Sequence, residues 1–243
     1  MKDHLLDLIE HTLTVGNMDV IKVTGTDKET KINAVTEGNT AIIEGTFKTP
    51  IADFIGVFGM PNLNKLKTIL SFDDYDDKAR IFMKRTERNG QQVPESIQFE
   101  TSASDFINVY RLMNETIVSD KVKSISFKGA TWNVEFNPSV ASILRLKKQA
   151  SANSEEQQFT TKVEGGNLKV YFGDAATHSG NFVFEANISG SLSHAWQWPV
   201  QQVLNILSLS GDKTMKISDQ GVAEITVDSG LTVYRYLIPA QSK

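Results

Sequence analysis

The chain has 243 residues, of which 40% are hydrophobic and 22% are charged, so it is long enough for one or two folded domains and disorder is not expected. Its net charge of −4 and pI near 5.6 exclude nucleic-acid binding through an overall positive field; any such contact requires a local basic patch. The lack of cysteine excludes disulfides, thiolate zinc sites and a cysteine nucleophile.

Neither a secretory signal nor a membrane span is expected. The first ten residues interrupt their apolar run with acids. No segment approaches the roughly 18 consecutive apolar residues that a membrane-spanning helix needs. These features predict a cytoplasmic protein with no membrane partner.

Helices and antiparallel strands are predicted to alternate along the first half. Leucines recur on one face of residues 2–14, which indicates an amphipathic helix. β-branched residues alternate with polar ones from residue 19 to 47, which indicates strands. The remaining elements expected in this half are a strand at 53–59, a helix at 61–71, an acidic loop at 73–77 and strands at 79–84, 96–100 and 106–113.

The second half is predicted to repeat this order after a connector. Residues 114–130 lack a strong period and separate two expected domains, 1–113 and 131–243. Pro199 suits the first turn of a helix, where its missing amide is not needed. The elements expected after the connector are a strand at 132–136, a helix at 138–149, strands at 158–164, 168–172, 181–189 and 192–197, a helix at 199–208, and strands at 213–218, 222–228 and 231–237.

Three short similarities between the halves support an internal duplication. The pairs are 35–39 with 163–167, 68–72 with 205–209, and 109–111 with 233–235. They occur in the same order about half a chain apart, which favours a repeated unit over two unrelated β-rich stretches. Two repeats are too few for a solenoid, so a ring built from several chains is the natural way to complete them.

This arrangement resembles the DNA polymerase sliding clamps, most closely those of tailed bacteriophages and the PCNA type. The resemblance rests on Trp198-Pro199-Val200, on the Leu-Ser helix ends at 70–71 and 207–208, and on the closing segment 234–240. It implies an α+β fold of two tandem clamp-type domains, each with two inner helices and antiparallel sheets outside. Three such chains would form a ring on double-stranded DNA.

The resemblance also implies a function without bond-making or cofactors. A closed ring holds a DNA polymerase to its template by topology, and a clamp-loader ATPase opens and closes it. In such a ring the outward faces of the inner helices contact phosphates without reading sequence. The residues expected to face DNA are Asn64, Lys65, Lys67, Arg145, Lys147, Lys148, Gln149, Gln201 and Asn205, with Lys2, Lys84, Arg85 and Arg88 as candidate supplements.

Two of the helices fit this expectation less well than the others. Projection of helix 138–149 turns Val140, Ile143 and Leu144 inward and Ser142 outward, and it leaves Lys147 on the apolar side. The outward face of helix 2–14 is acidic, which the resemblance does not explain. That face carries Asp3, Asp7 and Glu10, with His4 and His11 nearby.

In sliding clamps, partner peptides dock in an apolar pocket between the domains, beside the C-terminus. An extended partner would pair with exposed backbone while its apolar side chains fill the pocket. Ile238 and Pro239 are expected to lie beyond the last strand, where they are available for binding. The residues carried over by the resemblance are Leu112, Met113, Ile117 and Val118 with Tyr236, Leu237, Ile238, Pro239 and Ala240.

No catalytic or metal-binding motif is found in the sequence. His4 and His11 are too far apart for a one-turn metal pair, and no hydrolase elbow or phosphate-binding loop occurs. The acids of loop 73–77 lack the glycine and distal glutamate of a calcium loop and indicate a solvated loop. The alternatives to a clamp are a viral structural or assembly protein of two β-rich domains and, less favoured, an uncharacterised enzyme.

Overall fold

The computed structural model describes residues 1–16, 18, 20–122, 129–174, 176 and 178–241. The chain divides into two compact units: unit 1 is Met1–Ser126 with Ser229–Tyr234, and unit 2 is Phe127–Asp228 with Arg235–Lys243. The predicted domain limits did not place residues 229–234 with the N-terminal half. They belong to unit 1 in part because the Lys48 amide donates a hydrogen bond to the Leu231 carbonyl at 2.9 Å.

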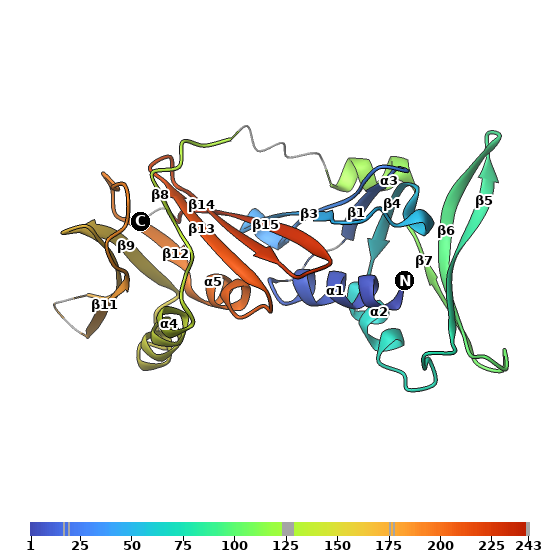
Figure 1. The fold of residues 1–243 in the computed structure, drawn as a ribbon, viewed down its shortest axis with the longest axis horizontal. Coiled ribbons are helices and arrows are strands. Elements are labelled where there is room, and N and C mark those ends of the chain that lie inside the picture. Colours follow the sequence, from blue (N-terminus) through green and yellow to red (C-terminus); the bar gives the residue numbers. More distant parts are fainter. Residues whose placement is uncertain (17, 19, 123–128, 175, 177, 242–243) are drawn as a thin grey trace. The chain divides into compact units, whose positions relative to one another are not determined.

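Unit 1 contains a helix, a four-stranded sheet, a second helix, a three-stranded sheet and, in the predicted connector, a third helix. Helices α1 and α2 contact one another and lie on the same side of the four-stranded sheet (Figure 1). The antiparallel strand orders are β4-β1-β2-β3 and β5-β6-β7. In chain order the elements are α1 (Lys2–Leu13), β1 (Val20–Gly25), β2 (Thr30–Val35), η1 (Glu37–Asn39), β3 (Ile42–Phe47), η2 (Ala52–Phe54), β4 (Gly56–Pro61), α2 (Leu63–Leu70), β5 (Arg80–Arg88), β6 (Gln91–Glu100) and β7 (Ile107–Arg111).

Unit 2 repeats this topology. Its sheets have the orders β12-β9-β10-β11 and β15-β14-β13-β8, so β9 to β12 follow the same spatial order, four, one, two, three, as β1 to β4, and β8 is an additional strand beside β13. The predicted duplication is therefore visible as a repeated fold. The elements are β8 (Val134–Phe136), α4 (Val140–Ala152), β9 (Gln158–Glu164), β10 (Asn167–Gly173), β11 (Ser179–Glu185), β12 (Trp196–Pro199), α5 (Val200–Leu207), β13 (Asp212–Ser218), β14 (Val222–Asp228) and β15 (Thr232–Pro239).

Two of the three sequence similarities join equivalent elements. The pair 68–72 and 205–209 marks the ends of α2 and α5, and the pair 109–111 and 233–235 lies in β7 and β15. The prediction that 35–39 and 163–167 are equivalent is wrong, because the first segment follows β2 whereas the second joins β9 to β10. Gly and Asn are common in turns of any origin, so this similarity arises from the residue types that turns require and does not mark equivalent positions in the two units.

The predicted connector contains a helix that the sequence pattern did not reveal. Helix α3 (Glu115–Lys121) begins at Asn114, whose side chain accepts a hydrogen bond from the Ile117 amide at 2.9 Å. Only Val118 of its seven residues is buried, so it lacks the apolar period that identifies longer helices. Residues 123–128 of the connector lie outside the described residues.

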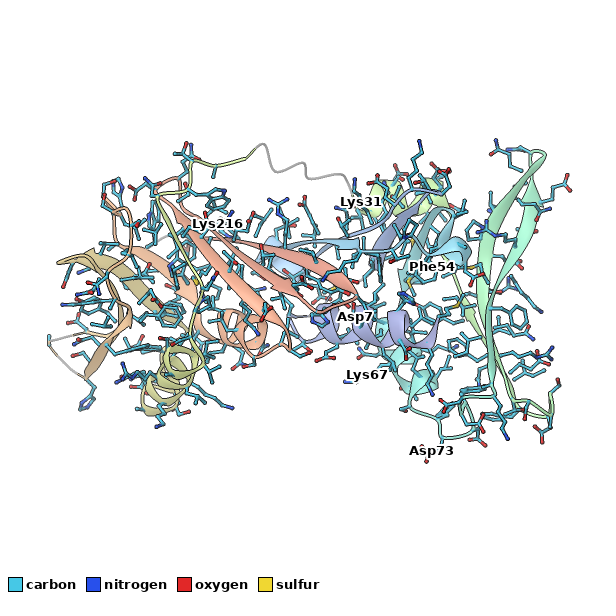
Figure 2. All side chains as sticks on the ribbon, in the orientation of Figure 1. Asp7, Lys31, Phe54, Lys67, Asp73 and Lys216 are labelled. Atoms are coloured by element: carbon cyan, nitrogen blue, oxygen red, sulfur yellow. The ribbon has the colours of Figure 1, made fainter. Side chains whose placement is uncertain are left out.

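Each unit has its own apolar core between helices and sheet. In unit 1, Phe54 and Phe58 meet edge to face with ring centroids 5.7 Å apart (Phe54 is labelled in Figure 2). In unit 2, Trp198 is fully buried and its indole donates to Thr161 Oγ1 at 2.8 Å. Among the described residues, no helix has the length and apolar character needed to cross a membrane.

Candidate nucleic-acid and partner interfaces

Helix α2 presents lysines to solvent, as predicted. Leu63, Leu66 and Leu70 are buried on its inner face, whereas Lys65 and Lys67 are exposed together with Asn64. Asn62 begins the helix by accepting a hydrogen bond from the Lys65 amide at 3.3 Å. Figure 2 shows Lys67 on the side of α2 away from the sheet.

Helix α4 is rotated relative to its predicted orientation. Val140 and Leu144, expected inside, are 75% and 52% exposed, and Ser142, expected outside, is buried. Ser142 can be buried because its hydroxyl forms a hydrogen bond of 2.8 Å with that of the cap residue Ser139, and Leu146 supplies the apolar anchor. The apolar residues were therefore a misleading guide to the buried face of this helix.

The rotation changes which polar residues of α4 reach solvent. Arg145, Lys147 and Lys148 are all exposed, so Lys147 is not on the buried side. Gln149 is half-buried and packs over β11, where a methyl group added to Gly180 would lie 2.2 Å from Gln149 Oε1. The three cations fit a phosphate-facing surface, and Gln149 serves helix–strand packing instead.

A hollow of about 380 Å³ lies between α4 and α5. Gln201 is exposed and donates from Nε2 to Asn205 Oδ1 at 2.7 Å, one helical turn away. This face of α5 thus offers amides without charge, and the positive charge beside it comes from α4. Residues that line the hollow include Lys147, Ser151, Ser154, Glu156, Gln201, Asn205 and Ser208.

The acidic face of α1 is smaller than predicted, because Asp7 is buried. Tyr234 Oη donates to Asp7 Oδ2 at 2.7 Å, and the His11 ring stacks on the Tyr234 ring with centroids 4.5 Å apart. His11 Nδ1 lies 2.9 Å from the Asp7 carbonyl oxygen. Asp7 therefore belongs to a polar cluster inside unit 1 (Figure 2), and of the three acids only Asp3 and Glu10 face solvent.

Two of the four supplementary cations are committed to structural contacts. Arg85 Nη2 donates to the carbonyl oxygens of Asp53 and Ile55 at 3.1 and 2.7 Å. Lys2 Nζ donates to the Tyr75 carbonyl at 2.5 Å. Lys84 and Arg88 are exposed on β5.

The predicted peptide pocket is only partly accessible. Leu112, Met113 and Ile117 line a hollow of about 170 Å³ within unit 1. Val118 is fully buried against Gly59, where an added methyl group would lie 2.8 Å from Val118 Cγ2. Tyr236, Leu237, Ile238, Pro239 and Ala240 belong to unit 2, and a pocket combining both sets stays a prediction.

The expectation that Ile238 lies beyond the last strand is wrong. Strand β15 continues to Pro239, and Tyr236, Leu237 and Ile238 are buried in succession, which means that both faces of the strand are covered there. The tail is also tied by its backbone: the Ala240 amide donates to the Gly221 carbonyl at 2.8 Å, and the Gln241 amide donates to that of Gln197 at 2.9 Å. Pro239 alone of these side chains is exposed.

A serine, histidine and aspartate meet on the surface of unit 2 without the arrangement of a hydrolase. Ser193 Oγ donates to Asp219 Oδ2 at 2.7 Å, whereas His194 Nδ1 lies 3.2 Å from Ser193 Oγ and 3.9 Å from Asp219 Oδ1. Burial would raise the pKa of Asp219, but hydrogen bonds from Ser193 and Trp196 outweigh it and hold the pKa below its ordinary value. The serine proton is directed at the carboxylate and not at the imidazole, so the trio anchors a loop.

The repeated topology and the paired helices define the fold of the sliding clamps of the PCNA type. Three solved structures show it: A. fulgidus PCNA bound to the C-terminal region of FEN-1 (TM-score 0.69, 10% identity, 100% of this chain and 96% of that chain), PCNA from Thermococcus kodakaraensis (0.67, 11%, 99% and 97%) and Proliferating Cellular Nuclear Antigen from Entamoeba histolytica (0.69, 12%, 97% and 94%). No protein-family model and no curated protein matches the sequence. The similarity therefore lies in the structure and defines the fold.

Proposed function

We propose that this protein is a sliding clamp, a ring of three chains that encircles double-stranded DNA and tethers a DNA polymerase without catalysing a reaction. The observation that carries the proposal is the clamp fold over the whole chain, combined with exposed cations on helices of both units. Partner docking by polymerase and clamp loader, and an origin in a bacteriophage, belong to the same proposal.

The charge distribution supports a duplex held loosely and without sequence preference. The chain is acidic overall, yet Lys65 and Lys67 on α2 and three cations on α4 are exposed. Phosphate contacts of this kind position DNA without reading bases. The alternative of a viral structural protein gives these helix faces no role.

The repeat itself suggests how copies could join. Within unit 1, the first residues of β15 lie next to β3. By topology β15 is the counterpart of β7, and β3 is the counterpart of β11. Both β7 and β11 are edge strands of their sheets, and an unpaired edge is a template for pairing with another chain. We therefore infer that β11 of one copy pairs with β7 of the next copy, in the way that β3 pairs with β15. Such a head-to-tail contact between copies generates rings.

Exposed apolar side chains at these two edges support the proposal that a second copy covers them. Ile107 and Val109 on β7 are 49% and 40% exposed, and Val140 and Leu144 on α4, which packs on β11, are more exposed still. Exposed apolar groups of this kind mark interaction sites. The arrangement accounts for the apolar face of α4 that points to solvent.

The absence of cysteine allows a direct test of encirclement. Val109→Cys on β7 and Asn181→Cys on β11 would be combined in one chain and joined by a flexible bis-maleimide in the presence of a nicked circular plasmid. We expect a covalent product of three 27.0 kDa chains that stays on the circle in denaturant and leaves the same plasmid after linearisation. Each single variant is the control, because a head-to-tail contact brings β7 to β11 and not to itself.

Several results would contradict the proposal. Closed rings that leave circular and linear plasmid equally would exclude encirclement, and crosslinking of the single variants as efficient as that of the double variant would exclude the head-to-tail contact. Polymerase tethering is tested separately, by processive synthesis with the cognate enzyme on circular primed DNA, which should disappear on linear templates with free ends.

A further inference from the structure

The outer edge of β5 is open, whereas the outer edge of its counterpart in unit 2 is covered. β5 follows α2 and is the outermost strand of its sheet, and no strand pairs with that edge among the described residues (Figure 1). β13 follows α5, and its outer edge pairs with the short antiparallel strand β8. The contact between copies that is proposed above uses β7, at the opposite edge of the unit 1 sheet, and therefore does not occupy β5.

A Met-Lys dipeptide marks equivalent positions on β5 and β13. In each sheet the methionine faces an isoleucine of the next strand, and the lysine that follows it faces a polar residue. The opposed residues are Met83 with Ile97 and Lys84 with Ser96 in unit 1, and Met215 with Ile225 and Lys216 with Glu224 in unit 2. Lys84 and Lys216 therefore occupy equivalent places in the two sheets.

Lys216 lies between two acids, and Lys84 does not. Lys216 Nζ lies 3.5 Å from Oε1 of Glu135, which stands directly opposite it on β8, and 4.0 Å from Oε1 of Glu224 on β14. In unit 1, Ser96 stands where unit 2 has Glu224. Within the part of the chain that the structure describes, Lys84 has no ion pair and no side-chain hydrogen bond. The open edge of β5 therefore carries a cation that lacks the acids of its counterpart.

The apolar side chains of β5 are also less covered than those of β13. Met215 and Ile217 of β13 are buried, and β8 adds the buried Val134 beside them. Phe82 and Met83 of β5 are only half-buried. A strand added to this edge would bury apolar surface and pair with the backbone N–H and C=O groups that an edge strand leaves free.

The charge of β5 restricts the kind of strand that it can accept. The strand contains four basic residues and one acidic residue, so the same edge of a second copy would be repelled. A segment that places a carboxylate opposite Lys84 would be attracted, as Glu135 is by Lys216. The charges therefore favour an acidic partner strand.

We propose that the outer edge of β5 binds an extended segment of a partner protein in which a glutamate is followed by an aromatic residue, as Glu135 is followed by Phe136 in β8. The glutamate stands opposite Lys84 and the aromatic side chain opposite Met83, in the register of β8 on β13. The site goes beyond the proposed function, because a single chain without DNA can form it. It shares no residue with the predicted peptide pocket.

The test uses dye-labelled peptides that copy residues 131–138, one with the natural sequence and one with Glu135→Lys. Fluorescence anisotropy with the full chain should show the natural peptide binding about fivefold more tightly, the upper range for one exposed ion pair. Lys84→Glu should reverse this preference. A preference that Lys84→Glu leaves unchanged would place the peptide elsewhere, for example on β13, and would contradict the proposal.

Methylation of the peptide backbone separates strand addition from simple charge attraction. Neighbouring residues of an antiparallel strand direct their amides to opposite edges, so only alternate amides of the peptide face β5. One peptide is methylated at the amide nitrogen of Glu135 and another at that of Phe136. One of the two should bind about tenfold more weakly, through a lost hydrogen bond and a steric clash, and the other should bind almost as the natural peptide does.

Lys28→Glu is the matched control, because it makes the same charge change at an exposed lysine in the turn between β1 and β2. It should keep the preference for the natural peptide. An equal loss of preference in both lysine variants, equal tolerance of both methylated peptides, or no binding at millimolar peptide would overturn the proposal. So would a labelled duplex that loses affinity in Lys84→Glu while the peptides show no preference, since this result assigns Lys84 to DNA. Rings closed on circular DNA with no peptide preference would reject this site alone.

Discussion

Strands β7 and β15 carry the same tripeptide, Val-Tyr-Arg, and use it in the same way in different surroundings. Tyr110 and Tyr234 are both buried and both donate a hydroxyl proton, to the Pro61 carbonyl and to the Asp7 carboxylate. Arg111 and Arg235 each pair with a glutamate of the preceding strand, Glu95 and Glu224. Yet β7 is an edge strand, whereas the first residues of β15 lie next to β3 within unit 1. The two copies of the repeat therefore share the tyrosine and arginine contacts within each unit and differ in whether a neighbouring strand covers the edge.

The largest expected difference between the two strands is in apolar burial. Ile238→Ala in β15 should lower the free energy of unfolding by roughly 2–5 kcal/mol, since it leaves a cavity at a fully buried position. Ile107→Ala in β7 removes a half-exposed side chain and should change it by about 0.5 kcal/mol or less in the monomer. Urea unfolding measures both, and equal effects would show that the strands are covered alike.

The two tyrosines should differ less. Tyr234→Phe removes a hydrogen bond to a buried carboxylate, at a cost of roughly 1.5–3 kcal/mol, whereas Tyr110→Phe removes a bond to a neutral carbonyl, worth about 0.5–1.5 kcal/mol. Thermal unfolding of the two variants provides the comparison. A larger destabilisation by Tyr110→Phe would mean that the Asp7 contact is weaker than its 2.7 Å length indicates.

The smallest effect concerns the helix faces of the two units. Replacing Arg145, Lys147 and Lys148 of α4 by Gln should make the negative slope of log affinity against log salt shallower by about 0.9 for every phosphate that is no longer neutralised. Replacing Lys65 and Lys67 of α2 should make it shallower by a smaller amount, since fewer cations are removed. Anisotropy of a labelled duplex over a salt series gives the slopes. Lys31→Gln, on the sheet, is the control, and a change as large as that of the helix variants would remove α2 and α4 from the DNA-contacting surface.

Much of the fold follows from sequence pattern because the strands alternate and the longer helices have an apolar face. The orientation of α4 did not follow, since Ser142 is buried with its hydroxyl bonded to that of Ser139 and Leu144 is exposed, which reverses the usual sorting by polarity. The burial of Asp7 was also hidden, because its partner Tyr234 is far away in the sequence. The cations of the candidate site were identifiable by type, while the hollow lined by Leu112, Met113 and Ile117 depends on how β6, β7 and α3 meet.

The assignment of residues 229–234 to unit 1 has a consequence for the order in which the protein is made. Domains of a nascent chain generally fold as they emerge, the N-terminal one first. Here the N-terminal unit needs Tyr234, which follows Asp7 by 227 residues, to satisfy that carboxylate in its interior. Unit 1 therefore completes its core only after residue 234 has been synthesised, and a fragment ending at residue 126 would carry a buried carboxylate without this hydrogen bond.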